Sequence, residues 1–303
     1  MYWILNGRSI GLSTRQNELI ELSLTHKFAG FDIDINEFHS QATESGIEYA
    51  MRFISSAPVK LGAFELPVRW QGEVANYKID LSNLDAVCQT AIAIGAKTCY
   101  STVLPYSDQL PYHENFDLAR ERLAEIGSVL ENHGIRLGIN FLAASHHREG
   151  HGEPFITKAE ELSTLVKTVG SSSIGLCLDT WNWYVGGGTL EQLKGIDVNN
   201  IVMVRIADVP ADAELSKVTD KQRLVPRESS VVPVADIIKH LDEQGFSGAI
   251  VPFFHPSQFS SRNKDAVVRG IREAIDRLFG KGLVAEEAIE EQEPAEEEVV
   301  AAT

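Results

Sequence analysis

Eight short runs of strand-forming residues recur along this sequence, with helix-type segments between them. The helical segments carry apolar residues three and four positions apart, as in Leu123, Ile126 and Leu130. Alternating strand–helix units give parallel strands joined by right-handed crossovers. Eight units predict an α/β fold, a closed (β/α)8 TIM barrel, rather than an open doubly wound sheet. The expected strands are Ser9–Ser13, Phe31–Asn36, Lys60–Leu66, Thr98–Val103, Arg136–Leu142, Ile174–Asp179, Ile201–Ile206 and Ala249–Phe254.

The connections differ in length on the two sides of the expected barrel. Gly30, Gly95, Gly134 and Gly245 come shortly before strands, where a left-handed glycine closes the preceding helix. The connections that follow strands are longer, and in a barrel they gather on the C-terminal face, where ligands bind. These loops are expected at Ala143–Phe155, Trp181–Thr189 and Val209–Val232.

Acidic residues are concentrated at the end of the chain. The 303 residues include 27 Lys and Arg against 43 Asp and Glu, a formal charge of −16. Residues 282–303 hold eight Glu and no Lys or Arg, so the rest of the chain carries −8. A like-charged, apolar-poor segment cannot offset its ordering entropy by burial. We therefore expect a barrel over residues 1–281 and a disordered acidic tail over 282–303; the alternative is a partner-binding segment.

The composition also excludes several classes of protein. A net negative charge repels phosphate backbones and anionic lipid, so nucleic-acid and membrane partners are not expected. Cys88, Cys99 and Cys177 form no C-x-x-C pair and no disulfide framework. The sequence shows neither a signal peptide nor a membrane span. The expected location is the cytoplasm.

Polar side chains stand where the expected strands end. In a barrel such residues line the ligand pocket, and this set suits a polyhydroxylated ligand. The residues are Asn6, Asp34, Glu65, Tyr100, Thr102, Asn140, Asp179, Asn182, Arg205, Asp208 and His255.

Four of these segments, read in order, resemble the xylose-isomerase-like barrels, the sugar phosphate isomerases/epimerases. They are residues 29–34 (AGFDID), 134–140 (GIRLGIN), 174–182 (IGLCLDTWN) and 204–208 (VRIAD), and the likeness spans roughly residues 6–280. The resemblance implies a sugar or sugar-phosphate isomerase or epimerase that moves a proton next to the carbonyl of a small molecule. Whether the chain forms a homo-oligomer is left open.

The resemblance also implies a divalent cation, manganese, magnesium or zinc, that polarises the carbonyl. Its ligands would be two Glu, an Asp, a His, and a His or Gln. Those positions fall on Asn140, Asp179, Asn182, Arg205 and Pro252, so only Asp179 keeps its ligand type. A permanent cation at Arg205 opposes a second one beside it. No metal cofactor is therefore expected, with a divalent metal as the alternative.

We expect Arg205 to replace the metal, either by pairing with Asp179 or by clamping an anionic group of a ligand. The expected catalytic residues are Asp179, Arg205 and His255. The expected substrate-binding residues are Glu65, Asn140, Trp181, Asn182, Asp208 and Arg227. The alternative reading is a non-catalytic, carbohydrate-binding or regulatory barrel.

A second histidine-rich segment lies in the loop after the fifth strand. His146, His147 and His151, with Glu149 and Glu153, are suited to hold a displaced metal ion. The sequence favours the alternative, a polar surface loop, because no helical or strand period places these residues on one face.

Overall fold

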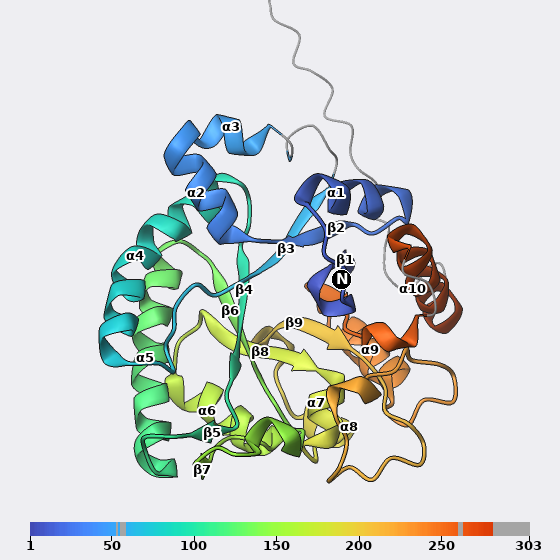
Figure 1. Cartoon of the computed structure of the whole chain (residues 1–303). Coiled ribbons are helices and arrows are strands. Elements are labelled where there is room, and N and C mark those ends of the chain that lie inside the picture. The colour runs from blue at the N-terminus through green and yellow to red at the C-terminus, as the bar shows by residue number, and fades with distance from the viewer. Residues whose placement is uncertain (53, 55–58, 260–262, 281–303) are drawn as a thin grey trace, which may run out of the picture.

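A closed barrel of eight parallel strands forms the centre of the protein (Figure 1). The computed structural model describes residues 1–52, 54, 59–259 and 263–280. The strands follow one another around the barrel in the order β1, β10, β9, β8, β6, β4, β3 and β2. They span Tyr2–Leu5 (β1), Gly30–Ile33 (β2), Lys60–Glu65 (β3), Thr98–Val103 (β4), Arg136–Phe141 (β6), Ile174–Asp179 (β8), Ile201–Ile206 (β9) and Ala249–Pro252 (β10). The predicted TIM barrel is confirmed.

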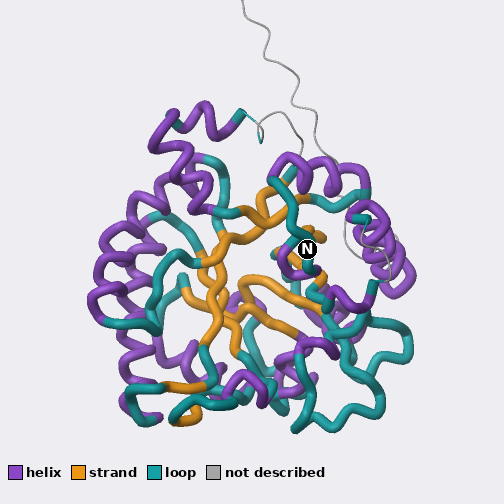
Figure 2. The backbone as a smooth tube through the Cα atoms, viewed as in Figure 1, coloured by secondary structure: helices purple, strands orange, loops and turns teal. Residues whose placement is uncertain are grey.

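Helices form an outer layer around the strands (Figure 2). Their apolar stripes pack against the barrel, and Leu123, Ile126 and Leu130 of α5 are fully buried. The helices span Gln16–Thr25 (α1), Ile35–Ser45 (α2), Ile47–Met51 (α3), Val74–Ala93 (α4), Tyr112–Asn132 (α5), Ala159–Val169 (α6), Thr180–Val185 (α7), Leu190–Lys194 (α8), Val234–Glu243 (α9) and Lys264–Phe279 (α10).

The first strand lies earlier than predicted. The expected strand at Ser9–Ser13 is wrong, because Arg8–Ile10 forms a 3-10 helix (η1) that Gly11 ends in a left-handed conformation. The strand is instead Tyr2–Leu5, a run of aromatic and aliphatic residues that pairs with both β10 and β2. This shift places Asn6 directly at the end of β1.

Glycines close three of the four expected helix ends. Gly95, Gly134 and Gly245 have φ angles of 85°, 64° and 80°. The prediction is wrong for Gly30, which lies within β2; a Cβ there would come within 1.8 Å of the Lys60 carbonyl oxygen. At that helix end Lys27 adopts the left-handed conformation, with φ of 56°.

The loops after the strands carry short elements on the C-terminal face of the barrel. The loop after β6 contains η2 (Ser145–Arg148) and β7 (Glu153–Pro154), and β7 pairs with β5 (Tyr106–Ser107). The loop after β9 contains η4 (Asp220–Gln222). The expected loop at 181–189 is mostly α7, which begins directly after β8 because Asp179 caps its N-terminus. The short helix η5 (Pro256–Gln258) follows β10 on this same face, whereas η3 (Val198–Asn200) precedes β9 at the other end of the barrel.

Two expectations concern the ends of the chain and the membrane. The acidic tail expected at 282–303 lies outside the described residues. Among the helices of the described ranges, none combines the length and the hydropathy that crossing a bilayer requires.

Candidate functional site

A layer of polar side chains lies above an apolar plug inside the barrel. The plug consists of Ile4, Ala63, Cys177, Met203, Ala249 and Val251. Side chains two positions apart on a strand point the same way, so the next inward residues of β1, β8 and β9 are Asn6, Asp179 and Arg205. All three are buried. Burial raises the pKa of Cys177, below this layer, to about 11, so its thiol stays protonated.

Asp179 is paired with an arginine that the sequence did not single out. Nη1 of Arg223 lies 3.1 Å and 3.0 Å from the two carboxylate oxygens of Asp179, and both side chains are at most 5% exposed. The guanidinium of Arg223 also stacks 4.5 Å over the ring of Trp181 and 4.6 Å over that of Phe253. The expected pairing of Asp179 with Arg205 is therefore wrong. Arg223 lies in the loop after β9, where the sequence has no helical or strand periodicity that would predict the direction of its side chain.

Arg205 lies between two aromatic rings instead. Its guanidinium carbon is 4.2 Å from the ring centre of Tyr100 and 4.9 Å from that of Phe253. Its Nε is buried without a hydrogen-bond partner, and no described carboxylate forms an ion pair with it. Burial alone would lower the pKa of Arg205, but Cys177, Tyr100 and nearby acidic groups raise it. Arg205 is therefore a buried fixed cation inside the barrel that has no ion-pair partner among the described residues.

Asp32 is a buried carboxylate that the sequence analysis missed. It accepts hydrogen bonds from the Ala63 amide at 2.6 Å and from Nδ2 of Asn6 at 2.7 Å. Burial raises its pKa to about 6, although these two hydrogen bonds and the charge of Arg205 act in the opposite direction. Gly62 leaves room for it, because a Cβ there would lie 2.2 Å from Oδ1 of Asp32. The sequence carried a signal for it, since Asp32 and Asp34 stand two positions apart within the expected strand Phe31–Asn36, where they would face the same way.

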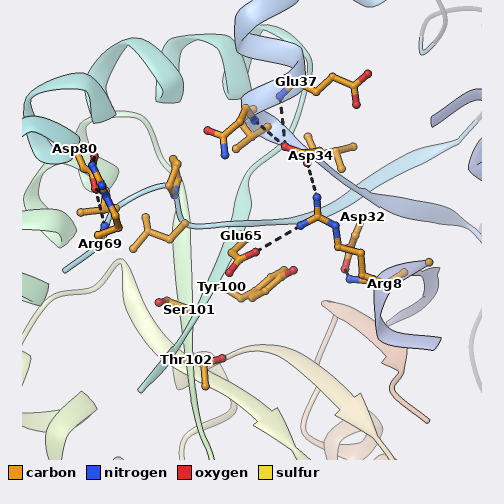
Figure 3. A pocket seen from close by; sticks show the side chains of 18 of the residues that line it. Arg8, Asp32, Asp34, Glu37, Glu65, Arg69, Asp80, Tyr100, Ser101 and Thr102 are labelled. Atoms are coloured by element: carbon orange, nitrogen blue, oxygen red, sulfur yellow. Dashed lines mark hydrogen bonds and ion pairs between the residues drawn. The ribbon is translucent and has the colours of Figure 1, made fainter. Parts of the chain in front are cut away.

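A cavity of about 1360 Å³ opens beside Asp32 at the mouth of the barrel, between the ends of β1, β2, β3 and β4 (Figure 3). Arg8 extends across it, 2.6 Å from Asp34 and 3.8 Å from Glu65. These three groups are exposed, so solvent screens their ion pairs. Burial raises the pKa of Tyr100 to about 12, so its hydroxyl on the cavity wall stays protonated. The cavity thus offers carboxylates, a guanidinium and a hydroxyl to a small polar ligand.

The structure separates the predicted substrate-binding residues. Glu65 lines the cavity. Asn140 on β6 and Asn182 on α7 are buried and do not line the cavity. Oδ1 of Asn140 and Nδ2 of Asn182 have no hydrogen-bond partner among the described residues, while Oδ1 of Asn182 accepts from the Ala143 amide. Trp181 is fully buried and donates from its indole to the Gln222 carbonyl at 3.1 Å.

The remaining predicted residues lie away from both groups. Asp208 is buried and accepts from the Val232 amide at 2.9 Å, which holds the loop after β9. Arg227 is exposed on that loop. His255 caps η5, where its Nδ1 accepts from the Ser257 amide at 3.2 Å. Asp208 and His255 thus make structural contacts, and none of the three residues lines the cavity.

The residues at the expected metal position do not fit a divalent cation. Both oxygens of Asp179 already face the guanidinium of Arg223, and Arg205 adds a second fixed cation in the same layer. Asn140 offers a neutral oxygen only. Directly after β10, the residue that contacts Arg205 is Phe253 rather than Pro252, and Phe253 has no ligand atom. Two guanidiniums and one engaged carboxylate repel rather than bind a metal ion.

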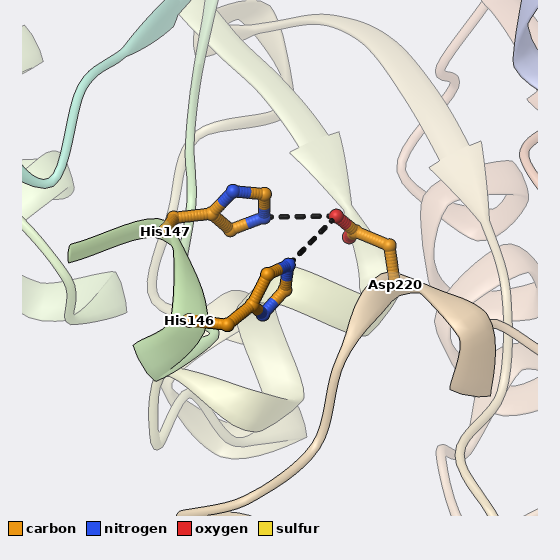
Figure 4. A group of neighbouring side chains, drawn as sticks. All are labelled: His146, His147 and Asp220. Carbon is orange, nitrogen blue, oxygen red and sulfur yellow. Dashed lines mark ion pairs between the residues drawn. The ribbon is translucent and has the colours of Figure 1, made fainter. Parts of the chain in front are cut away.

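The histidine-rich loop is divided between two places. His146 and His147 both face Asp220 of η4, at 3.3 Å and 2.9 Å (Figure 4). His151 instead stacks on Tyr106 and contacts Asp108 at 3.2 Å. The three histidines expected as one group therefore do not share a site. Asp220 was missed by the sequence analysis, since it comes from a loop some 70 positions further along the chain.

Residues 17–278 match the family described as the xylose isomerase-like TIM barrel, and the chain belongs to this family. A curated relative, the inosose isomerase of Bacillus subtilis (strain 168), is 22% identical over 200 residues, which cover 65% of this chain and 68% of that protein. Two solved structures share the fold. A xylose isomerase domain protein from Alicyclobacillus acidocaldarius has a TM-score of 0.79 at 20% identity, with 92% of this chain and 98% of that chain covered. The IOLI protein with a zinc atom has a TM-score of 0.77 at 17% identity, with 93% and 99% covered.

Proposed function

We propose that the protein binds a small polyhydroxylated carbonyl compound in the cavity beside β1–β4 and isomerises it by moving a proton next to the carbonyl. One observation carries this proposal. Asp32, a buried carboxylate with a pKa of about 6, lies on the cavity wall. The barrel interior also holds Arg205, whose guanidinium has no ion-pair partner among the described residues. A base poised near neutral pH and a fixed cation are what such a proton transfer requires.

Asp32 acts as the general base in this proposal. It removes the proton from the carbon next to the carbonyl, and the electron pair moves onto the carbonyl oxygen to give an enediolate. Arg205 stabilises the negative charge on that oxygen, which is the part a divalent cation plays in a metal-dependent isomerase. The proton of the adjacent hydroxyl passes to the former carbonyl oxygen, and Asp32 returns its proton to the former carbonyl carbon, so that the carbonyl now stands at the neighbouring position. The protonated hydroxyl of Tyr100 and the carboxylate of Glu65 hold substrate hydroxyls.

This arrangement favours isomerisation over epimerisation. A single carboxylate can remove and return a proton on one face of the enediolate, whereas inversion of a carbon requires a second acid on the opposite face. Asp179 does not supply one in this proposal, because Arg223 occupies both of its oxygens. His255 is assigned a structural role because its Nδ1 caps η5.

The substrate class follows from the family and from the relative that acts on an inosose, a polyhydroxylated cyclic ketone. The lining of the cavity suits such hydroxyl-rich ligands, with Asn6, Glu65, Tyr100 and Thr102 among its polar residues. Arg8 and Arg69 at its rim could bind a phosphate, so the test includes sugar phosphates.

Exchange of the proton next to the carbonyl tests the proposal. The chelator-treated protein is incubated in D2O with inososes, ketohexoses and ketose phosphates, and proton NMR follows the loss of the relevant signal. We expect exchange with at least one of these compounds, and a loss of more than about 100-fold in Asp32→Asn and in Arg205→Met. Arg120→Met, a change at an exposed surface arginine, is the matched control. Exchange that needs an added metal, or that persists in Asp32→Asn, would overturn the assignment.

The second candidate is a non-catalytic carbohydrate-binding barrel. It is favoured by the amide and guanidinium groups at the family's ligand positions, Asn140, Asn182 and Arg205. Ligand-dependent stabilisation without any proton exchange would identify this function, because binding to the folded state alone raises the melting temperature.

A further inference from the structure

Two histidines and one aspartate from separate loops converge on the C-terminal face, outside the cavity described above. Nε2 of His146 and Nε2 of His147 point at the same oxygen, Oδ2 of Asp220 (Figure 4). One ligand atom from each residue lies within 4.8 Å of the other two. All three side chains are between 23% and 37% exposed, so an ion can reach them from solvent.

The spacing of these atoms is close to that of a zinc site. Zinc binds imidazole nitrogen and carboxylate oxygen at about 2.0–2.2 Å, so ligand atoms around a tetrahedral ion lie about 3.3 Å apart. The observed distances to Oδ2 are 3.3 Å from His146 and 2.9 Å from His147. To hold an ion, Nε2 of His147 only has to move a few tenths of an ångström away from Oδ2 of Asp220, from 2.9 Å to about 3.3 Å.

The contacts leave nitrogen atoms without hydrogen bonds. Nε2 of His147 is buried and lies 2.9 Å from Oδ2 of Asp220, but the two groups are not oriented for a hydrogen bond. Nδ1 of His146 is also buried without a hydrogen-bond partner. Buried polar atoms in native proteins are nearly always satisfied by protein, water or an ion. An ion bound by these nitrogens would satisfy Nε2 of His147.

The remaining oxygen of Asp220 is held from behind, as in established metal sites. Nε of Arg223 lies 3.2 Å from Oδ1 of Asp220 and leaves Oδ2 for the histidines. Metal-binding carboxylates are commonly oriented by such an outer hydrogen bond. Burial alone would raise the pKa of Asp220, but the contact with His147 and the charge of Arg223 hold it well below its usual range. The charge of Arg223 is shared between two carboxylates, Asp179 and Asp220, so these three side chains together carry one net negative charge, which attracts a cation.

The two loops that supply the ligands are already fixed to each other. The Ser145 hydroxyl donates to the Ser216 carbonyl at 2.9 Å, next to the histidines in one loop and four positions before Asp220 in the other. The Trp181 indole holds η4 through the Gln222 carbonyl. Little ordering is therefore required when an ion binds, which favours affinity.

We propose that His146, His147 and Asp220 form a binding site for one divalent cation of the zinc type, which joins the loop after β6 to the loop after β9. Two imidazoles and one carboxylate select zinc, cobalt or nickel over magnesium and calcium, which prefer oxygen ligands. The site is separate from the position of Asp179 and does not depend on the proposed proton transfer. Its effect is to clamp the two loops over the mouth of the barrel.

Isothermal titration of chelator-treated, full-length protein with zinc alone tests the site. We expect one ion per chain with a dissociation constant on the order of 1 μM, and a rise in melting temperature on saturation. Cobalt should bind with the intense visible absorption of a four-coordinate ion, and magnesium should give no heat. Binding should weaken as the pH falls, because both imidazoles must be neutral.

Matched variants assign the ion to these residues. His147→Ala, and His146→Ala combined with His147→Ala, should weaken zinc binding by more than about 100-fold. His151→Ala, a histidine of the same loop paired with Asp108, should leave binding within about twofold. All three changes are at partly exposed side chains, and circular dichroism checks the fold. A chain without saturable zinc binding, or zinc binding unchanged in the double variant, would refute the site.

Discussion

Replacing Arg223 by methionine should destabilise the protein strongly, because the change leaves the Asp179 carboxylate buried without its counter-ion. Both carboxylate oxygens face Nη1 of Arg223, at 3.1 Å and 3.0 Å, and the two side chains are 5% and 1% exposed. Removing one partner of a buried ion pair costs about 3–5 kcal/mol. Asp179 keeps the amide of Asn182 as a donor at 3.0 Å, and methionine keeps part of the packing on Trp181 and Phe253. The loss is therefore expected near the lower end of that range, about 3 kcal/mol.

Urea unfolding followed by circular dichroism measures this loss as a lower midpoint at an unchanged slope. Arg120→Met is the matched control, because Arg120 is 40% exposed and its contacts to Asp117 and Glu121 are 3.6 Å and 3.7 Å. Its loss should stay below about 0.5 kcal/mol. Combining Arg223→Met with Asp179→Asn should recover at least about half of the lost stability, since it removes the unpaired charge but keeps the cap of α7.

Two results would refute this reasoning. One is an Arg223→Met variant as stable as Arg120→Met, which would mean that the pair contributes nothing. The other is a variant that Asp179→Asn fails to rescue, because the loss would then come from packing rather than charge.

Three further predictions concern the polar layer inside the barrel. Arg205→Met should leave stability unchanged or raise it, since Nε of Arg205 is buried without a hydrogen-bond partner, and the variant should lose proton exchange. Urea midpoints measure the stability and the NMR assay measures the exchange. A loss of stability above about 2 kcal/mol would contradict this prediction. The pKa of Asp32 rises from 3.8 to about 6 on folding, so the folded state binds the proton more tightly and stability falls as the pH rises between these values. Relative to Asp32→Asn, the wild type should lose about 2 kcal/mol of stability from pH 4 to pH 7, and kcat/KM should rise through an apparent pKa of about 6. A stability difference or a rate profile that does not change with pH would contradict this prediction. Gly62→Ala should destabilise the chain by about 1–3 kcal/mol and reduce exchange, because its Cβ would meet Oδ1 of Asp32 at 2.2 Å; a variant with wild-type stability and rate would rule out that close approach.

The fold was predictable because each strand–helix unit has a local signal. The strands at Thr98–Val103, Ile174–Asp179 and Ile201–Ile206 have the predicted bounds. The first strand was missed because Tyr2–Leu5 is short and lies at the very start of the chain, where the pattern has no preceding unit to anchor it.

The site was less predictable, since its decisive contacts join distant loops. Asp179 and Arg205 lie inside the barrel, as their positions near the ends of the expected strands predicted, but adjacency on neighbouring strands did not make them an ion pair. The true partner, Arg223, is 44 positions from Asp179 in a loop without a hydrophobic period. Asp220 meets His146 and His147 by the same kind of long-range contact. Asp32 was predictable from its two-residue spacing to Asp34 within the expected strand, although it lies before the strand end, where pocket residues are expected.

The Arg223–Asp179 pair bears on how this barrel can be engineered. In TIM barrels the loops after the strands are the parts most freely exchanged between relatives, because the barrel itself supplies stability. Here the loop after β9 supplies the counter-ion of a carboxylate inside the barrel. A graft that replaces this loop would leave Asp179 uncompensated unless the graft brings its own cation or Asp179 is changed with it. A chimera therefore has to exchange the loop that carries Arg223 together with the residue at position 179.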